Sequence, residues 1–369
     1  MALHLAAPRS SILNKQEMCI SQRISNSTTG NMKPNLNNHT GRLKIKLANV
    51  AAENLIKLNK AMNKLELFCW KQAGKVDENT VNHVDIFSGR LFKGGRVFQQ
   101  HFLIRSYELG PDSKISVGAL VNLLQESALN HFKSVVLVAE GFGSTPEMSK
   151  RNLIWVVLSM QIVIDSYSSW GDIVQVETWS CASGRHGARR DWLVRDYNTG
   201  KTLLRAVCVY VMLNKKTRKL SKFIQETREE TKGMFMDHCD PIIEQDCRKL
   251  RDLDFDTADY IRTGLLNLLQ SNWTDLDVNQ HVNHVKYIDW ILENAPESVV
   301  ETHKLSAMRL EFRKECGKNS SLQSLCALAR ETHETETDDD REIEMDHTLR
   351  LVENGSQILR ARTVWMPRN

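Results

Sequence analysis

The spacing of hydrophobic residues predicts two long amphipathic helices, one in each half of the chain. In the first, apolar residues between positions 117 and 135 recur at intervals of three and four behind Ser116, a favourable N-cap residue. In the second, residues 283–294 show the same spacing and stop before Pro296, which cannot continue a helix. Each helix is therefore expected to bury one face.

Each predicted helix is followed by four strand-like runs separated by turn-like residues. After the first helix the runs are 153–165, 173–182, 189–196 and 203–213. After the second helix they are 304–316, 321–330, 342–352 and 357–365. A strand at 97–107 precedes the first helix, and 260–269, a strand or a helix, stands at the matching place before the second. This repeated layout predicts an α+β fold in which an antiparallel sheet wraps each helix.

The two copies differ in the chemistry that they carry. Asp277, Asn279 and His281 stand at i, i+2 and i+4 on the loop that enters the second helix. A carboxylate, an amide and an imidazole can relay a proton, orient a water and donate to an oxyanion, and a helix N-terminus adds positive potential. The alternative is that the Asp and Asn only cap the helix. Residues 111–115, before the first helix, have no such set, so we expect that copy to hold an apolar ligand.

Residues 1–50 differ in charge from the rest of the 369-residue chain. They hold seven Lys and Arg against one acid, Glu17, together with many Ser, Thr and Asn. This composition is typical of an organellar transit peptide, and an ordinary tail is the alternative. The whole chain carries +4, so the remainder is slightly negative and gives no argument for nucleic-acid binding. Residues 51–91 are interpreted as a linker that includes an amphipathic helix.

The eight cysteines show no spacing that indicates a metal or redox site. No C-x-x-C pair occurs, so we expect neither a zinc site nor a disulfide framework, and no cofactor. Scattered cysteines fit a reducing compartment, where most are small buried hydrophobes. The hydrophobic content of 41% supports ordinary globular cores, and no apolar run approaches the roughly 18 residues of a membrane span.

Residues 275–283 read Asp-Leu-Asp-Val-Asn-Gln-His-Val-Asn, which resembles the signature of plant plastid acyl-acyl-carrier-protein thioesterases. Further stretches resemble the B-type, saturated-chain-preferring branch, in that family's order: 130–131, 141–148, 152–157, 170–176, 189–196 and 313–317. The resemblance implies tandem hot-dog domains. It places an acyl-chain pocket in residues 92–225, a linker in 226–258 and a catalytic domain in 259–369.

The resemblance also implies an activity, which is hydrolysis of fatty acyl-acyl carrier protein in the plastid stroma. The reaction releases free fatty acid and ends chain elongation, and the loaded carrier protein is the expected partner. A homodimer is a further expectation. The family's catalytic positions fall on Asp277, Asn279, His281, Glu315 and Cys316.

Two other functions stay open on the same fold. The link 265–272 is longer than in the family and lacks its Pro, which leaves open a catalytically impaired binding protein for acyl carrier protein or acyl chains. The other alternative is an acyl-CoA thioesterase.

Two mechanisms fit the candidate residues. In one, Cys316 is the nucleophile, His281 its base and Asn279 the orienting group. In the other, water or Asp277 attacks while His281 and Glu315 handle protons. Neighbouring strand residues point to opposite faces, so Glu315 and Cys316 cannot both enter the site unless a bulge intervenes at the following glycine. We favour the carboxylate–histidine mechanism and interpret Cys316 as a packed thiol.

Periodicity also predicts residues that line the pocket, and the acidity of the carrier protein that the resemblance implies predicts a basic docking face. The lining residues are Leu124, Ala128, Phe132, Trp155 and Met160. Two basic clusters are candidates for docking, with a solvated surface as the alternative: Arg185, Arg189 and Arg190 in one, and Lys215, Lys216, Arg218, Lys219 and Lys222 in the other. We interpret His131 as a core histidine and His284 as peripheral.

Overall fold

The computed structural model describes residues 89–139, 143–183, 187–244, 246–263, 269–330 and 342–368. The chain divides into two compact units, 1–82 and 83–369, and every described residue belongs to the second. The predicted transit peptide, the amphipathic helix of the 51–91 linker, Arg185 and the first half of the unusual 265–272 link therefore lie outside the described residues.

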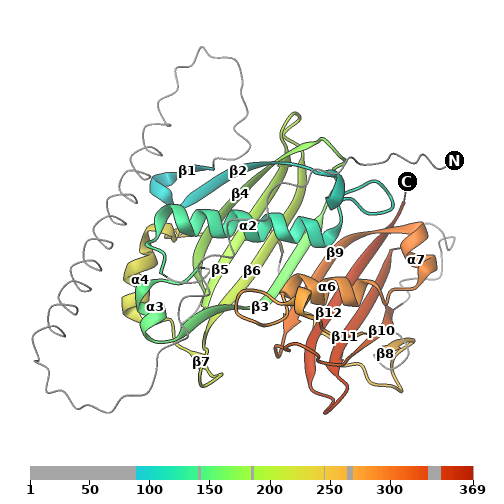
Figure 1. The fold of residues 1–369 in the computed structure, drawn as a ribbon. Coiled ribbons are helices and arrows are strands. Elements are labelled where there is room, and N and C mark those ends of the chain that lie inside the picture. The colour runs from blue at the N-terminus through green and yellow to red at the C-terminus, as the bar shows by residue number, and fades with distance from the viewer. Residues whose placement is uncertain are drawn as a thin grey trace, which may run out of the picture. The chain divides into compact units, whose positions relative to one another are not determined.

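The described strands form one twelve-stranded antiparallel sheet (Figure 1). The first half contributes β1 Arg90–Phe92, β2 Val97–Leu103, β3 Leu153–Ile164, β4 Ile173–Ser183, β5 Gly187–Asp196, β6 Thr202–Asn214 and β7 Leu220–Ser221. The second half contributes β8 Tyr260–Thr263, β9 His303–Phe312, β10 Leu322–Arg330, β11 Ile343–Leu351 and β12 Gln357–Pro367. Their spatial order is β1-β2-β4-β5-β6-β3-β9-β12-β11-β10-β8, with β7 beside β6.

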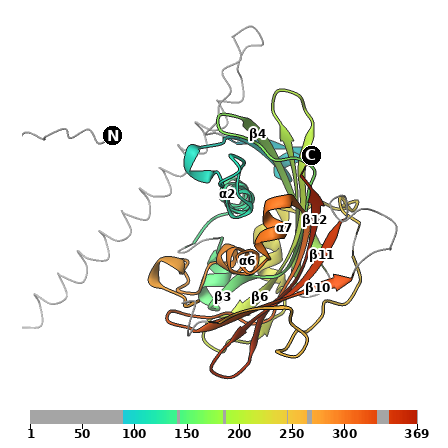
Figure 2. The ribbon, with the colours of Figure 1, turned by 90° about the vertical axis from the view of Figure 1, so that its right-hand side faces the viewer.

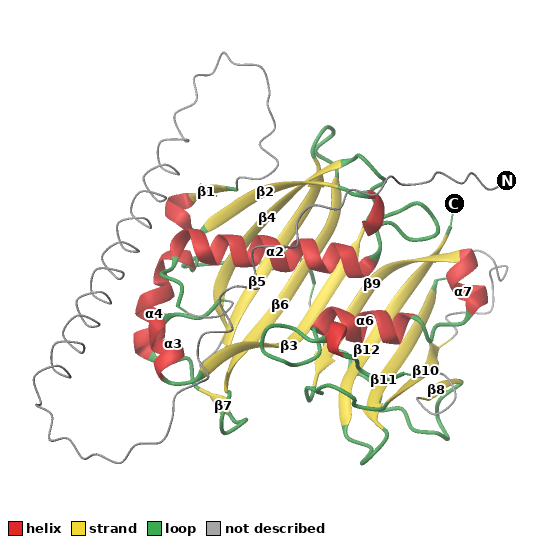
Figure 3. Cartoon of the chain, viewed as in Figure 1, coloured by secondary structure: helices red, strands yellow, loops and turns green. Residues whose placement is uncertain are grey.

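Two helices, α2 and α6, lie on the same side of this curved sheet (Figures 1 and 2). Helix α2 (Val117–Val135) crosses the strands of the first half, and α6 (His284–Leu292) crosses those of the second. Short helical segments connect the strands, as Figure 3 shows by colour. They are η1 Lys93–Gly95, η2 Ser106–Glu108, α3 Pro146–Lys150, α4 Gln225–Thr231, η3 Lys232–Met234, η4 Trp273–Asp275 and α7 Glu297–Thr302.

A side-chain cap sets the start of each long helix. The Ser116 hydroxyl accepts from the Ala119 N–H at 3.2 Å, as its N-cap role predicts. The Asn283 side chain accepts from the Val285 N–H at 3.1 Å and so begins α6. Because the helix starts after Asn283, the preceding loop is free to take an irregular path, and this loop carries the candidate chemistry.

The two halves are fused through β3 and β9, which pair in register from Ser159↔Glu311 to Val163↔Ala307. Leu310 and Met308 of β9 are buried in the core shared by both halves. A helix wrapped by an antiparallel sheet, present twice, is the tandem hot-dog fold that the resemblance implied, and the predicted α+β class is confirmed. The domain limits at residues 225 and 259 stay predictions.

The predicted strands agree with the observed ones to within a few residues, except at two ends. The strand predicted at 304–316 ends at Phe312, so residues 313–317 leave the sheet. The strand predicted at 97–107 ends at Leu103 because a short 3-10 helix follows. At the ambiguous segment 260–269, a strand covers Tyr260–Thr263.

One expectation about the cysteines is wrong, because Cys181 and Cys239 form a disulfide. Their separation of 58 residues gave no recognisable spacing, and only the packing of the segment after η3 beside β4 brings them together. Closing a loop of that length contributes about 4 kcal/mol to the free energy of unfolding in the chain-entropy model. The other described cysteines are Cys208, Cys316 and Cys326, which are buried, and Cys247, which is exposed.

Replacement of Trp192 is expected to weaken the first half strongly. Its indole is 1% exposed, and its N–H donates to the Leu124 carbonyl at 2.9 Å, joining β5 to α2. Trp192→Ala should lower the free energy of unfolding by roughly 3–5 kcal/mol, measured by urea denaturation. The control Trp170→Ala removes an indole that is 70% exposed and should cost less than about 0.5 kcal/mol. Equal effects of the two variants would contradict this packing.

Candidate active site

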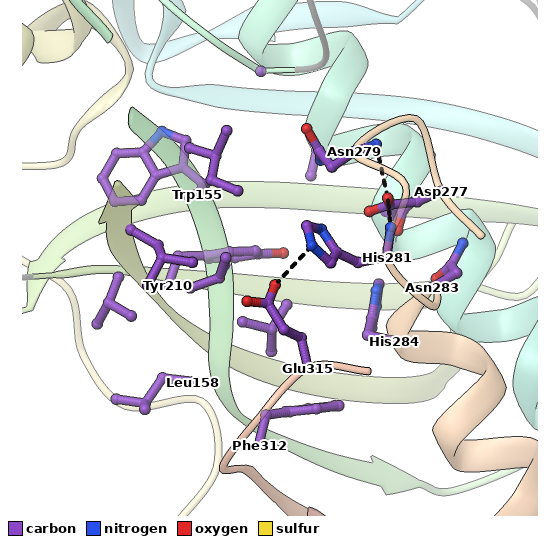
Figure 4. A pocket seen from close by; sticks show the side chains of 18 of the residues that line it. Trp155, Leu158, Tyr210, Asp277, Asn279, His281, Asn283, His284, Phe312 and Glu315 are labelled. Carbon is purple, nitrogen blue, oxygen red and sulfur yellow. Dashed lines mark hydrogen bonds and ion pairs between the residues drawn. The ribbon is translucent and has the colours of Figure 1, made fainter. Parts of the chain in front are cut away.

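A cavity of about 1090 Å³ lies between α2, the sheet and the loop that enters α6 (Figure 4). Among the predicted lining residues, Ala128, Phe132 and Trp155 lie on its wall. Leu124 and Met160 instead are 1% and 3% exposed and pack in the core between helix and sheet. The apolar wall therefore comes mainly from the first half, while polar groups of the second half complete the cavity.

The loop from Leu276 to Asn283 is a tight turn organised by Asp277. The Asp277 N–H donates to the His281 carbonyl at 2.7 Å, and the Gln280 N–H donates back to the Asp277 carbonyl at 2.9 Å. One carboxylate oxygen of Asp277 accepts from the N–H groups of Asn279 at 2.8 Å and His281 at 3.2 Å. Asp277 thus shapes the turn, whereas Asn283 caps the helix. The side chains of Asn279 and His281 line the cavity.

His281 and Glu315 lie close together in the cavity, with their side chains pointing toward each other (Figure 4). The His281 Nε2 atom lies 3.5 Å from a Glu315 carboxylate oxygen. Burial, and next the positive charge of Arg218, lower the pKa of His281 below its ordinary value, while the charge of Asp277 acts in the opposite direction. His281 is therefore neutral near pH 7 and able to accept a proton.

Arg218 is a site residue that the sequence pointed to only as a docking residue. Its guanidinium forms an ion pair with Glu315 and lines the cavity. It comes from the exposed turn after β6 and has a positive φ of 56°. Its pairing with Glu315 joins residues 97 positions apart, for which the sequence held no signal. The charge of Glu315 is thus shared between a guanidinium and an imidazole.

Cys316 lies beside Glu315 but in different surroundings. The residue is 4% exposed, and its sulfur lies 3.4 Å from the Tyr287 hydroxyl, which also accepts from the Cys316 N–H at 3.2 Å. Burial raises the pKa of the thiol. Both residues reach the cavity wall without a bulge because the strand has already ended at Phe312, so strand alternation does not apply to them.

His284, interpreted as peripheral, lies on the cavity wall. The interpretation assumed helical geometry at Asn283, but the helix begins only at His284. The imidazole packs edge-on against Phe312, with ring centroids 6.3 Å apart, and burial lowers the pKa of His284 to about 4.

His131 is a core residue, as we interpreted it from the sequence. It is fully buried, and its Nε2 atom lies 2.8 Å from the Gly95 carbonyl.

In the first predicted docking cluster, the prediction that Arg190 contacts the carrier protein is wrong. That side chain is 5% exposed, because Arg190 shares the inner face of β5 with Trp192 and contacts His131 and Thr178. Arg189 is half-buried and forms a two-pronged pair with Asp191, with both N–O distances 2.7 Å.

The second cluster is exposed and lies in and just after the turn that follows β6, beside the site through Arg218. It consists of Lys215, Lys216, Arg218, Lys219 and Lys222.

Among the described residues, no group of three or more His, Cys, Asp or Glu side chains is placed to hold a metal ion. No helix in this part of the chain has both the length and the apolar composition needed to cross a membrane.

Comparison with known proteins identifies relatives along both halves. Residues 95–231 match the family described as acyl-ACP thioesterase N-terminal domain, and 260–367 match the acyl-ACP thioesterase C-terminal domain. The chloroplastic palmitoyl-acyl carrier protein thioesterase of Arabidopsis thaliana is 52% identical over 284 residues, which are 76% of this chain and 67% of that protein. The chloroplastic acyl-[acyl-carrier-protein] hydrolase FATB2 of Cuphea viscosissima is 50% identical over 281 residues, 76% and 65% of the two chains.

A solved structure supports the same assignment. The 12:0-ACP thioesterase from Umbellularia californica is 45% identical, with a TM-score of 0.67 over 74% of this chain and 94% of that chain. The matched part spans about two thirds of the length of the curated relatives above. The resemblance to the plant B-type branch is confirmed, and the chain belongs to the acyl-acyl-carrier-protein thioesterase family.

Proposed function

We propose that the protein hydrolyses the thioester of fatty acyl-acyl carrier protein, releasing free fatty acid and so ending chain elongation. One observation carries this proposal: an apolar cavity of about 1090 Å³ ends at a neutral imidazole paired with a carboxylate. The apolar wall suits an alkyl chain, and the polar end suits hydrolysis of its carbonyl group. Relatives named for palmitoyl and 12:0 substrates support the same substrate class.

In the proposed mechanism, water is the nucleophile. His281 takes a proton from water as it attacks the thioester carbonyl, and Glu315, 3.5 Å away, stabilises the imidazolium that forms. Asn279 positions the water or the carbonyl from the same cavity wall. When the carbon–sulfur bond breaks, the carrier thiolate takes the proton back from His281. The Asp277 carboxylate accepts two backbone N–H bonds and is better suited to holding the turn than to attack.

A nucleophilic Cys316 has less support. Its thiol is buried with a raised pKa and contacts the Tyr287 hydroxyl, whereas a nucleophilic cysteine needs a lowered pKa and a nearby base.

The described end of the unusual link also favours a working enzyme over an impaired one. The Ser271 hydroxyl donates to the Gly317 carbonyl at 2.6 Å, which anchors the approach to the active loop beside the Glu315 segment.

The exposed turn after β6 is the proposed docking surface for acyl carrier protein. Arg218 connects this turn to the site, and Lys215, Lys216 and Lys219 extend the positive charge outward. Positive charge attracts an acidic partner and orients it before contact. The homodimer stays a prediction.

The relatives are named as chloroplastic proteins, which supports a plastid location for this chain as well. The basic, hydroxyl-rich and acid-poor residues 1–50 agree with import into that organelle. Within the plastid we place the protein in the stroma.

Purified protein is expected to release free fatty acid from a matched series of acyl-carrier-protein substrates, measured by product analysis for each chain length. His281→Ala should lower kcat/KM by about 10²-fold or more, because a general base typically contributes 10²–10⁴-fold. The control His238→Ala removes an imidazole that is 85% exposed and should change little. Faster hydrolysis of acyl-CoA than of acyl carrier protein would identify the protein as an acyl-CoA thioesterase. Binding of acyl carrier protein without turnover would identify it as a binding protein.

Variants at the two neighbouring residues 315 and 316 should separate the mechanisms. Glu315→Gln is expected to lower kcat by roughly 10²-fold, because it removes the charge that stabilises the imidazolium. Cys316→Ala should keep most of the activity, because the thiol packs against Tyr287. Loss of activity in Cys316→Ala with normal thermal stability would make the cysteine the nucleophile.

The charge of Arg218 is expected to set the acidic limit of activity. The base must be neutral to accept a proton. The value of kcat/KM is therefore highest above the folded pKa of His281 and falls as the pH drops through that pKa. Arg218 lowers that pKa, so Arg218→Gln should move the acidic limb of the pH profile to higher pH. Lys219→Gln removes an equal charge from the same turn, but Lys219 is not among the charges that shift the pKa of His281, so the limb should stay in place. A limb that does not move in Arg218→Gln would contradict this assignment.

A further inference from the structure

The Cys181–Cys239 disulfide joins the sheet to the segment that follows η3. Cys181 lies near the end of β4, and its partner lies 58 residues later, with the two Cα atoms 6.4 Å apart. The proposed hydrolysis uses neither sulfur. The position of the bond nevertheless relates it to the cavity.

The segment that Cys239 tethers forms part of the cavity wall. Met234 and Phe235 line the cavity, and so does Ser180, the residue before Cys181. The Met236 N–H donates to the Ser180 carbonyl at 2.8 Å, and Phe235 forms an isolated parallel bridge with Ser180. The wall at this place therefore depends on how closely the segment is held to β4.

Beyond the backbone contacts with Ser180, one ion pair and the apolar packing of Phe235 hold this segment. Asp237 forms an ion pair with Arg96, but the two side chains are 82% and 39% exposed, and exposed pairs contribute little. Phe235 packs on Phe223 with ring centroids 5.8 Å apart. Among the described residues, the disulfide is the one covalent restraint between this segment and β4.

The two sulfur-bearing residues differ in their accessibility. Cys181 is 8% exposed, whereas Cys239 is half-buried between the exposed residues His238 and Asp240. Thiol–disulfide exchange requires a thiolate to reach one of the two sulfurs. A reductant therefore meets Cys239 first, and Cys181 becomes the leaving thiol.

We propose that Cys181–Cys239 is a thiol–disulfide exchange site for a dithiol reductant, and that its reduction loosens the acyl-chain wall of the cavity. A thiolate of the dithiol attacks the Cys239 sulfur, the disulfide bond breaks, and Cys181 leaves as a thiolate that takes up a proton. The second thiol of the reductant then attacks the mixed disulfide and releases the Cys239 thiol. Two electrons and two protons pass to the protein, and the dithiol becomes a disulfide.

The effect on catalysis rests on the proposed function, whereas the exchange itself does not. The full chain is to be equilibrated in buffers of reduced and oxidised dithiothreitol, alkylated, and analysed by peptide mass spectrometry, with hydrolysis of acyl carrier protein measured in parallel. Cys181 and Cys239 should become alkylated together, and only after reduction. The KM should then rise roughly threefold or more with a smaller change in kcat, because the wall holds the chain rather than the reacting atoms.

Three variants serve as controls. Cys239→Ser and Cys181→Ser should show the kinetics of the reduced protein without any dithiol, whereas Cys247→Ser removes an exposed cysteine outside the disulfide and should keep the response. Alkylation of both residues without reductant, or unchanged kinetics after full reduction, would overturn the proposal. Absence of hydrolysis in both redox states would reject the proposed function alone, and the alkylation pattern would still decide whether exchange occurs.

Discussion

The hydrogen-bonded joint between β3 and β9 determines where the chemistry meets the ligand. It continues one sheet through both halves, with Met160 opposite Leu310 and Ile162 opposite Met308, all four buried. A joint of paired backbone and packed side chains fixes the two helices on one face of the sheet. The loop before α6 is thereby held over a cavity whose apolar wall comes mainly from the other half. The complete cavity therefore needs both halves.

Within that frame, the site depends on a balance of charge around Glu315. Its carboxylate faces Arg218 on one side and His281 on the other. Burial lowers the pKa of the histidine, and the guanidinium acts in the same direction. The Val282 N–H donates to the Cys316 carbonyl at 3.1 Å, so the loop that carries His281 and the segment that carries Glu315 are tied together. The two reactive side chains consequently keep their spacing.

Sequence periodicity predicted the two helices and nearly all strands, because each buries one face and repeats with its own period. The motif at 277–281 located the loop, and the cavity contains all five predicted catalytic positions. Three features could not be predicted from the sequence because they depend on contacts between distant segments. They are the end of β9 at Phe312, the pair between Arg218 and Glu315, and the disulfide. The burial of Arg190 could have been predicted, because it shares a strand face with Trp192.

The ends of the sheet have a consequence for self-association. Its outermost described strands, β1 and β8, are three and four residues long, whereas strands near the centre such as β6 reach thirteen. A short edge offers few unpaired backbone groups as a template for another chain, which is a common way for proteins to avoid uncontrolled sheet growth. Within the part of the chain that the structure describes, these two edge strands therefore offer another copy only a short template for strand addition.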